Sequence, residues 1–317
     1  MSDSNSPLVS IGMPVWNGEL FLYQAIESLL SQDYKNIELI VLDNLSTDKT
    51  SEICKKFSLQ DTRVQYVLDT QHRDVIGAFN KIASLVKGNY FMVGNDDDVY
   101  EPSYISTLMR ILLANPDIGL AYSGCNSILT DGTIRASIWK WRLTKESSTV
   151  SNFVQYFFKR NPIPICFGIM RTSLHLEGLQ FFFRPDSWGW NHDNLYMLRI
   201  LSLTKVQSIP DPLFLYRERN RDLVYAQRGQ RDFDKSAFRA FWQTCMHQIN
   251  VSVVAFRILY ISPFNFIEKI FLSVYIFFCT IYFSFGYIIL IPLVKMLKII
   301  YSKLTYRVST NYAKGIF

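Results

Sequence analysis

The sequence predicts an α/β fold in which a mostly parallel central sheet is flanked by helices. Short, almost continuous apolar runs, typical of strands buried on both faces, alternate with segments whose apolar residues recur at helical spacing. Polar turns of a few residues join them, which favours strand–helix–strand units and therefore parallel strands. Ligands bind such sheets beyond the carboxyl ends of the strands, so the residues that follow each apolar run are the candidate site.

The first 122 residues carry the regular part of this pattern. Pro14 ends the first apolar run, because proline has no N–H to donate to a ladder, and Asp43 ends the second. We expect strands at 8–13, 37–42, 64–68, 90–94 and 118–122, and helices at about 22–30, 48–57, 75–86 and 102–114. Residues 123–159 are expected to be irregular, and another strand is expected at 165–171.

Three adjacent carboxylates follow the fourth apolar run. Asp96, Asp97 and Asp98 come just after Gly94, which places them in a loop at the carboxyl edge of the sheet. Carboxylate oxygens are the ligands that Mg²⁺ and Mn²⁺ prefer, and such a metal can bridge the phosphates of a nucleotide. The alternative is a solvated acidic loop, because Asp is common in turns.

Two other strand ends carry chemistry that complements these acids. Trp16 could pack against a nucleobase, although it could also be a core residue. Asp43 could accept a hydrogen bond from a base N–H or from a ribose hydroxyl. Because parallel strands bring both residues to the edge where the aspartates lie, together they outline a nucleotide-diphosphate site.

Four sequence blocks make the prediction more specific. They are Pro14–Gly18, Ala25–Gln32, Glu38–Asp48 and Lys87–Tyr90, the last just before the acidic loop. In order and spacing they resemble a family-two glycosyltransferase of the GT-A fold, which is Rossmann-like. The resemblance implies an inverting transferase that uses a nucleotide-diphosphate-sugar donor, Mn²⁺ or Mg²⁺ as cofactor, and a hydroxyl of a glycan as acceptor.

The resemblance also assigns residues to the donor site. Trp16 stands where the family usually has Tyr beside the base, and Pro14 and Asn17 belong to the same donor-binding turn. Asp43 matches the acid that recognises the base. Asn44 replaces a second Asp that is common there, which leaves the identity of the nucleotide open.

The acidic loop matches the family's Asp-x-Asp motif with one departure, because Asn95 takes the first position. Asp97 is then the best metal ligand, and Asp96 is expected on the ribose or the metal. Asp98 is assigned to the metal, with the alternative that it holds the loop in shape.

The second half of the chain resembles the family's acceptor-binding region. Asp193 matches the general base, with His192 in place of the usual Glu, although Asp193 could also serve as a helix cap. Arg217 and Arg219 match a segment in which basic side chains meet the donor diphosphate, or they could be surface arginines. In the irregular region, Trp139 and Trp141 could stack on a sugar or be structural.

The distribution of charge and of cysteine residues indicates the class of binding partner and the cellular compartment. The net charge of +6 comes from residues 251–317, which hold seven Lys or Arg against Glu268 alone. Because this charge lies beside the most apolar part of the chain, it favours anionic membrane lipid rather than nucleic acid. Five dispersed cysteines fit a reducing compartment, and the polar N-terminus shows no secretory signal, so we expect the catalytic part in the cytosol.

We therefore expect a GT-A catalytic domain at 1–250 and a membrane-associated helical region at 251–317. Within the catalytic domain, residues 1–115 would bind the donor and 116–250 the acceptor. Residues 270–294 contain no charged side chain and are long enough to cross a bilayer. Because the basic flank that follows prefers the cytosolic side, we favour an in-plane, re-entrant or hairpin arrangement over a single span. These helices could also form a homo-oligomer.

The prediction is thus an enzyme at the cytoplasmic face of the inner membrane. It would transfer a sugar to a glycan, with a lipid-linked glycan favoured, in the synthesis of cell-surface polysaccharide or glycolipid. One alternative is a polyprenyl-phosphate glycosyltransferase, whose acceptor needs no strong base. Another is a catalytically silent scaffold in a membrane polysaccharide-assembly complex, because Asn44, Asn95 and His192 depart from the family pattern.

Overall fold

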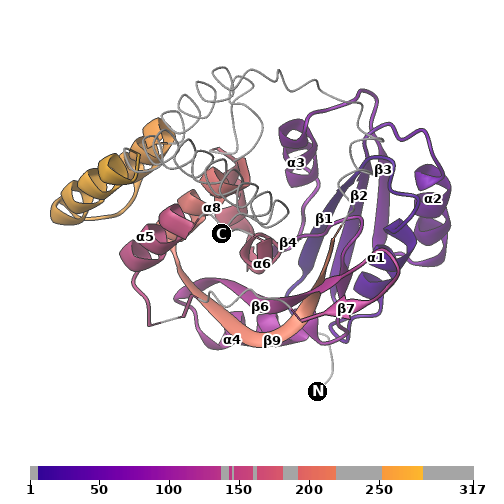
Figure 1. The fold of residues 1–317 in the computed structure, drawn as a ribbon. Helices are drawn as coiled ribbons and strands as arrows, with labels where there is room; N and C mark the ends of the chain where they lie inside the picture. The colour runs from indigo at the N-terminus through magenta and orange to yellow at the C-terminus, as the bar shows by residue number, and fades with distance from the viewer. Residues whose placement is uncertain are drawn as a thin grey trace, which may run out of the picture.

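The computed structural model describes residues 6–136, 143–144, 146–159, 163–180, 192–218 and 252–280 (Figure 1). Its labelled elements, in chain order, are β1 (Val9–Val15), α1 (Leu22–Leu30), β2 (Ile37–Asp43), α2 (Thr50–Gln60), β3 (Val64–Leu68), α3 (Val75–Ala83), β4 (Tyr90–Val93), β5 (Val99–Tyr100), α4 (Tyr104–Ala114), β6 (Ile118–Ile128), β7 (Ile134–Arg135), α5 (Thr149–Lys159), α6 (Ile163–Cys166), β8 (Ile169–Arg171), α7 (Thr172–Leu179), α8 (His192–Leu203) and β9 (Lys205–Arg217). The five strands expected before residue 123 are confirmed.

The strands form one sheet in the order β3-β2-β1-β4-β8-β6-β9-β5, with β7 beside β6. The first four strands are parallel, as expected. The expectation of a mostly parallel sheet is wrong for the second half, because β8 runs antiparallel between β4 and β6. Figure 1 shows β6 and β9 curling along the lower part of the view, below α5, α6 and α8 and above α4.

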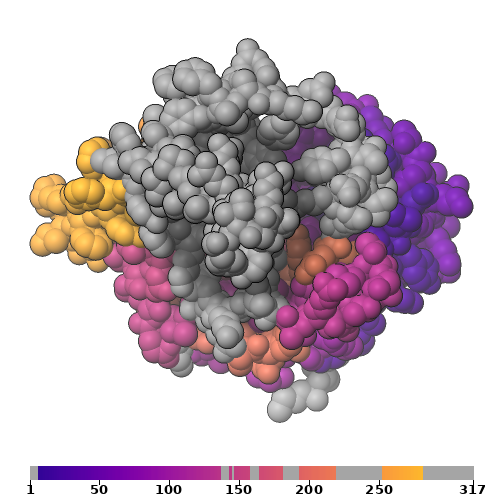
Figure 2. Space-filling model, in the orientation of Figure 1, coloured from indigo at the N-terminus to yellow at the C-terminus, as the bar shows by residue number. Residues whose placement is uncertain are grey.

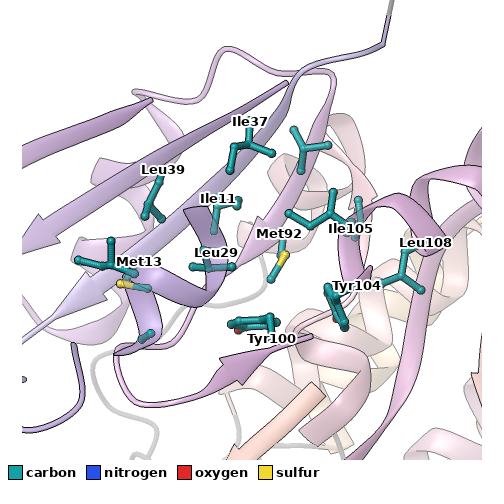
Figure 3. Close-up of a cluster of buried hydrophobic side chains, with 14 of the residues drawn as sticks. Ile11, Met13, Leu29, Ile37, Leu39, Met92, Tyr100, Tyr104, Ile105 and Leu108 are labelled. Carbon is teal, nitrogen blue, oxygen red and sulfur yellow. The ribbon is translucent and has the colours of Figure 1, made fainter. Parts of the chain in front are cut away.

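Alternation along the central strands directs side chains to two apolar layers. Ile11 and Met13 of β1 and Met92 of β4 face α1 and α4, where Tyr104 of α4 belongs to the same buried cluster (Figure 3). On the other face, Phe91 of β4 packs with α3. The helices α5, α7 and α8 close a third cluster beyond it. The sheet is therefore buried on both faces, which explains its continuous apolar runs.

The second half of the chain differs from expectation at three places. The segment expected to be irregular contains α5, whose first turn is capped by Ser148 through Ser151 N–H. The strand expected at 165–171 is divided into α6 and β8. The long strand β9 contains Pro210 and Pro212, which the sheet accommodates because the β6–β9 register shifts there, from Ser123–Ile209 to Cys125–Phe214.

At the C-terminal end of the described chain, residues 252–261 and 266–280 form two helices. Among the described residues, no helix combines the length and apolarity that crossing a bilayer requires. Residues 281–294 of the expected membrane segment lie outside the described residues, and so does the expected domain boundary at 250. The membrane and domain predictions therefore stay predictions.

Candidate active site

The order of the parallel strands reverses between β1 and β4. The neighbours of β1 are β2 on one side and β4 on the other, and the ladder to β4 ends at Gly12–Val93. Pro14 lies just beyond that end, where its missing N–H leaves no gap in the ladder. Val15 pairs with Asp43, so the loops after β1 and β2 emerge together beside the loop after β4. Such a switch point is where open α/β sheets bind ligands.

The loops after β1 and β2 are joined by hydrogen bonds. Asn17 N–H donates to Ser46 Oγ at 2.9 Å, and Asn17 Oδ1 accepts from Thr47 N–H at 2.8 Å. Gly18 N–H donates to Thr50 Oγ1 at 2.9 Å. Asn17 has φ of 52°, a left-handed conformation that Asn tolerates better than most residues. The amide of Asn17, expected to contact the donor, therefore holds the shape of this turn.

Trp16 follows the last residue of β1 at this edge of the sheet. Its side chain is 38% exposed, and its ring meets the imidazole of His72 edge-on at 5.2 Å. His72 Nδ1 lies 3.1 Å from the carbonyl oxygen of Asn44, which fixes the imidazole beside the indole. The exposed indole is suited to stacking on a planar base. Sequence reasoning missed His72, because a single histidine in a loop gives no signal.

Asp43 lies beneath this surface rather than on it. Its side chain is fully buried, Oδ1 accepts from Ser46 N–H at 2.9 Å, and Oδ2 accepts from the Tyr66 hydroxyl at 3.1 Å. The carboxylate thus ties the loop after β2 to β3. The structure gives Asp43 a role in supporting the site, and its expected contact with the base stays a prediction.

Asn44 gives a physical reason for its departure from the family pattern. Its Oδ1 accepts from Arg73 N–H at 2.7 Å, and its Nδ2 donates to the Arg73 carbonyl oxygen at 2.8 Å. An aspartate could not make the second bond, because an ionised carboxylate only accepts. Arg73 also pairs with Asp69, which lowers the pKa of Asp69. Asp69 and Arg73 are therefore further residues of this edge that the sequence did not reveal.

The acidic loop meets the first turn directly. A Cβ placed on Gly18 would lie 3.0 Å from Asp96 Oδ2 and 2.7 Å from Val15 Cγ2, so the half-buried Asp96 packs against glycine backbone. Asp97 is 8% exposed. The structure thus brings together the turn that carries Trp16 and the aspartates, as the strand topology predicted.

Asp98 is fully buried, and both of its carboxylate oxygens accept hydrogen bonds from the protein. Asn95 Nδ2 donates to Oδ2 at 2.6 Å, and Arg217 N–H donates to Oδ1 at 2.7 Å. Burial and the neighbouring charge of Asp97 raise the pKa of Asp98 to about 8. Of the two roles expected for Asp98, these contacts support the holding of the loop.

Arg217, the last residue of β9, occupies a place that the sequence did not predict. Only 2% of the residue is exposed, Nε donates to the Asp97 carbonyl oxygen at 2.6 Å, and the guanidinium lies 4.2 Å from the Phe21 ring centroid. The other two nitrogens donate to Leu129 O and Gln24 Oε1. These contacts give Arg217 a role in holding the acidic loop, and its expected contact with the donor diphosphate stays a prediction.

The carboxylates fit a metal that is held mainly by substrate. Among the residues that the structure describes, no group of three or more His, Cys, Asp or Glu is arranged to hold a metal ion by itself. Mg²⁺ is commonly bound through one or two carboxylates together with substrate phosphates. Asp96 and Asp97, on a loop at the switch point, match that donor set and are the residues that would hold it.

Asp193, in the first turn of α8, lies at the same edge of the sheet. β9 runs in the direction of β4, and Thr204 alone separates it from α8, so α8 leads back from the carboxyl edge. Cys166 precedes β8 at that edge, because Ile169 pairs with Met92. Burial, and next the charge of Asp193, raise the pKa of the Cys166 thiol.

The Asp193 residue is exposed, and its Oδ1 accepts from Asn194 N–H at 2.9 Å. An exposed carboxylate at the edge that carries the aspartate loop is suited to receiving a proton from a bound hydroxyl. Arg219, Trp139 and Trp141 lie outside the described residues, and their expected roles stay predictions.

Comparison with known proteins adds a family to this geometry. Residues 10–174 match the model of Glycosyl transferase family 2. The glycosyltransferase GlyG of Streptococcus pneumoniae is 36% identical over 105 residues, which cover 33% of this chain and 35% of that protein. An uncharacterised glycosyltransferase of Methanocaldococcus jannaschii, MJ1057, is 24% identical over 86% of this chain and 96% of its own length. The match thus spans about a third of GlyG.

A third relative is named the putative colanic acid biosynthesis glycosyl transferase WcaA of Escherichia coli. It is 33% identical over 105 residues, which cover 33% of this chain and 38% of that protein. Among solved structures, residues 1–349 of TarS from S. aureus align with a TM-score of 0.60 at 14% identity, over 87% of this chain and 72% of that chain. This likeness confirms a GT-A-like α/β fold. Since the family model covers more than half of the sequence, the chain belongs to glycosyl transferase family 2.

Proposed function

We propose that the chain transfers a sugar from a nucleotide-diphosphate-sugar donor to a hydroxyl of a glycan acceptor. The observation that carries the proposal is the switch point of the sheet, where exposed Trp16, the loop of Asp96 and Asp97, and the start of α8 share one edge. TarS, which has the same fold, has been solved with UDP and with UDP-GlcNAc. A nucleotide sugar is therefore the donor class that suits this edge.

In this proposal, the indole of Trp16 stacks on the base, and Asp96 and Asp97 lie toward the diphosphate. A bound Mn²⁺ or Mg²⁺ would offset the negative charge that develops on the leaving diphosphate. Arg217 and Asp98 keep the acidic loop in place. Their buried contacts preorganise the carboxylates, so that little rearrangement accompanies donor binding.

Asp193 acts as the general base. Its carboxylate takes the proton from the acceptor hydroxyl while the hydroxyl oxygen forms a bond to the anomeric carbon and the bond to the diphosphate breaks. Attack from the side opposite the leaving group inverts the anomeric configuration. General base catalysis of this kind contributes roughly 10²–10⁴-fold to the rate.

We further propose a lipid-linked glycan as the acceptor and the cytoplasmic face of the inner membrane as the location. The name of WcaA refers to the biosynthesis of a polysaccharide. The basic charge of residues 251–317 suits a surface of anionic lipid. Holding enzyme and acceptor in one plane would raise their effective concentration.

A thermal-shift panel tests the donor site. UDP, GDP and their sugar conjugates are added to the full chain with and without Mn²⁺, and the midpoint of unfolding is measured. We expect one nucleotide to raise the midpoint only with Mn²⁺, since a ligand at about 100 times its Kd adds about 2.7 kcal/mol to stability. Lys87→Gln serves as a control, because Lys87 is exposed in the loop after α3, and the midpoint shift of this variant should equal that of the wild type. If no nucleotide changes the midpoint, the proposal fails and a scaffold role is favoured.

A further inference from the structure

The described part of the C-terminal region is an antiparallel helical hairpin, residues 252–280. Asn265 and Glu268 form reciprocal hydrogen bonds of 2.9 Å, a capping box that begins the second helix. Ser252 Oγ lies 2.5 Å from Thr280 Oγ1, so the far ends of the two helices meet. In Figure 1 the hairpin lies at the margin of the molecule, beside α5 and far from β2 and β3.

One side of the hairpin is attached to the protein. The Phe264 ring meets Phe153 of α5 edge-on at 5.9 Å, and the Tyr275 hydroxyl donates to the Val154 carbonyl oxygen at 3.2 Å. Leu272 and Ile276 are buried in the cluster that also contains α5 and α8. The hairpin therefore packs on α5 through its inner side, and its outer side carries exposed side chains.

The outer side is almost entirely apolar. Eleven of the 21 exposed large apolar side chains in the described chain lie in this hairpin, namely Val253, Phe256, Tyr260, Ile261, Phe266, Ile267, Ile270, Phe271, Val274, Phe277 and Phe278. On the second helix they recur at intervals of three and four residues and so form one continuous stripe. Figure 2 shows the hairpin as an outlying lobe. A contiguous apolar surface of this kind marks an interaction site.

The charge of this region identifies the partner. Arg257 is exposed, and Lys269 Nζ donates to the Tyr260 carbonyl oxygen at 2.9 Å, which holds a cation beside the apolar stripe. A protein interface would offer about one hydrogen bond per 100–200 Å², but the exposed polar groups of the described hairpin are the side chains of Arg257 and Asn265 and the hydroxyl of Tyr260. Apolar residues bordered by cations suit the headgroup–acyl boundary of an anionic bilayer.

We propose that the outer side of residues 252–280 inserts into one leaflet of an anionic membrane, with both helices in the plane of the surface. The in-plane orientation follows from the packing of the inner side on α5. Because α5 packs on α8, which begins with the turn of Asp193, the acceptor half of the enzyme would face the lipid. The inference rests on the proposed function for its use of a lipid-linked acceptor, but membrane binding can be measured without it.

Co-sedimentation of the full chain with vesicles tests the proposal. We expect binding to vesicles of equal parts phosphatidylcholine and phosphatidylglycerol, and weaker binding to phosphatidylcholine alone or at high salt. Phe271→Glu/Phe278→Glu should lower the partition coefficient at least roughly tenfold, because anions replace two phenyl rings that would be inserted in the bilayer. Leu59→Glu, at a leucine that is 88% exposed on α2, is the matched control and should bind as the wild type. Arg257→Gln/Lys269→Gln should weaken the preference for anionic lipid, while the five Lys or Arg of residues 281–317 keep part of it.

Two further measurements separate the outcomes. The shift in unfolding midpoint with UDP or GDP and Mn²⁺ should be equal in the wild type and the double Glu variant, which shows that the variant is folded and its donor site intact. Failure of that shift in both proteins counts against the proposed function, not the hairpin. The hairpin proposal is overturned if the wild type does not bind vesicles. It is also overturned if light scattering shows that the wild type is a dimer and the double Glu variant a monomer, while the two proteins bind vesicles equally.

Discussion

The donor edge and the α5–α8 layer are built from different contacts. At the donor edge, side chains from loops far apart in the sequence hydrogen-bond to each other's backbone, as Asn17 does with the loop after β2 and Asp98 with Arg217. Around α5 and α8 the contacts are mainly apolar, and among the described residues no hydrogen-bond partner reaches the two side-chain polar atoms of Asn152 or His175 Nε2. Each such group costs about 1–3 kcal/mol.

The difference shows that the hydrogen bonds between distant side chains are concentrated at the donor edge. Carboxylates that will meet a diphosphate must be held in position before the donor arrives, because reorganisation would reduce their effect on the transition state. A dense network of hydrogen bonds does this at the donor edge. The other layer is held by apolar packing and presents further apolar surface outward on residues 252–280. Mutations at the two places should therefore affect different properties.

The largest effect is expected from Asp97→Asn at the donor edge. Loss of one charge should lower sugar transfer by at least about 10³-fold, since a preorganised group near the leaving diphosphate contributes roughly 10²–10³ or more. The Mn²⁺-dependent rise in unfolding midpoint with nucleotide should also disappear, and EDTA should have the same effect on the wild type. Nucleotide binding that stays dependent on Mn²⁺ in this variant would assign the metal to other residues.

Asp193→Asn should separate the chemistry from donor binding. The amide cannot take a proton, so transfer should fall by roughly 10²–10⁴-fold while the nucleotide-induced midpoint shift stays unchanged. Transfer is followed as release of free nucleotide in the presence of a membrane lipid extract. Full activity in this variant would leave Asp193 as a helix cap and favour a phosphate acceptor, which needs no strong base.

Arg217→Met tests whether the acidic loop is held from behind. Three protein acceptors would lose their donor, and we expect a loss of about 3 kcal/mol in the free energy of unfolding, together with weaker Mn²⁺-dependent nucleotide binding. Arg63→Met is the control, because Arg63 pairs with Asp61 at a partly exposed site away from the donor edge and should lose less than about 1 kcal/mol. Equal losses in both variants, with normal nucleotide binding, would refute the positioning role.

The sequence predicted the parts of the site that local patterns specify. Apolar runs and their breaks located the ends of β1, β2 and β4, and parallel topology then implied that Trp16 and the aspartates meet. The contact between Arg217 and the acidic loop joins residues 119 positions apart, and no local pattern in one sequence encodes such a pairing. The buried state of Asp43 was missed for the same reason, since its partner Tyr66 comes from β3.

The errors in the second half have two physical sources. The antiparallel direction of β8 could not be predicted, because an apolar run of a few residues carries no information on strand direction. In contrast, α5 could have been found. Val150, Phe153, Val154 and Phe157 recur at helical spacing after Ser148, a favoured cap residue, and α5 was missed because the irregular sequence around it obscured this short amphipathic pattern.

A buried histidine makes the α7–α8 layer sensitive to acid. His175 stacks on Phe91 at 3.7 Å, and burial lowers the pKa of His175 to about 3, from 6.5. The unfolded chain therefore binds a proton below pH 6.5 that the folded chain does not, so stability falls as the pH decreases from 6.5 toward 3. At pH 5 the loss should be about 2 kcal/mol. Denaturant titrations of His175→Phe should show a smaller decrease in the free energy of unfolding from pH 7 to pH 5 than those of the wild type. An equal decrease in the two proteins would exclude His175 as the source of the acid sensitivity.

The smallest effects are expected from substitutions at two glycines. Comparing them distinguishes the effect of close packing from that of backbone strain. Gly18→Ala places a methyl group against Val15 and Asp96, so we expect a loss of about 1–2 kcal/mol in stability and weaker nucleotide binding, because Asp96 must move. Gly132 has φ of 86° with no atom within 4 Å of an added Cβ, so Gly132→Ala should lose about 1 kcal/mol through backbone strain alone. Calorimetry and nucleotide titration of both variants make the comparison. If Gly132→Ala weakens nucleotide binding as much as Gly18→Ala does, the effect reflects general destabilisation and the contact between Gly18 and Asp96 does not position the acid.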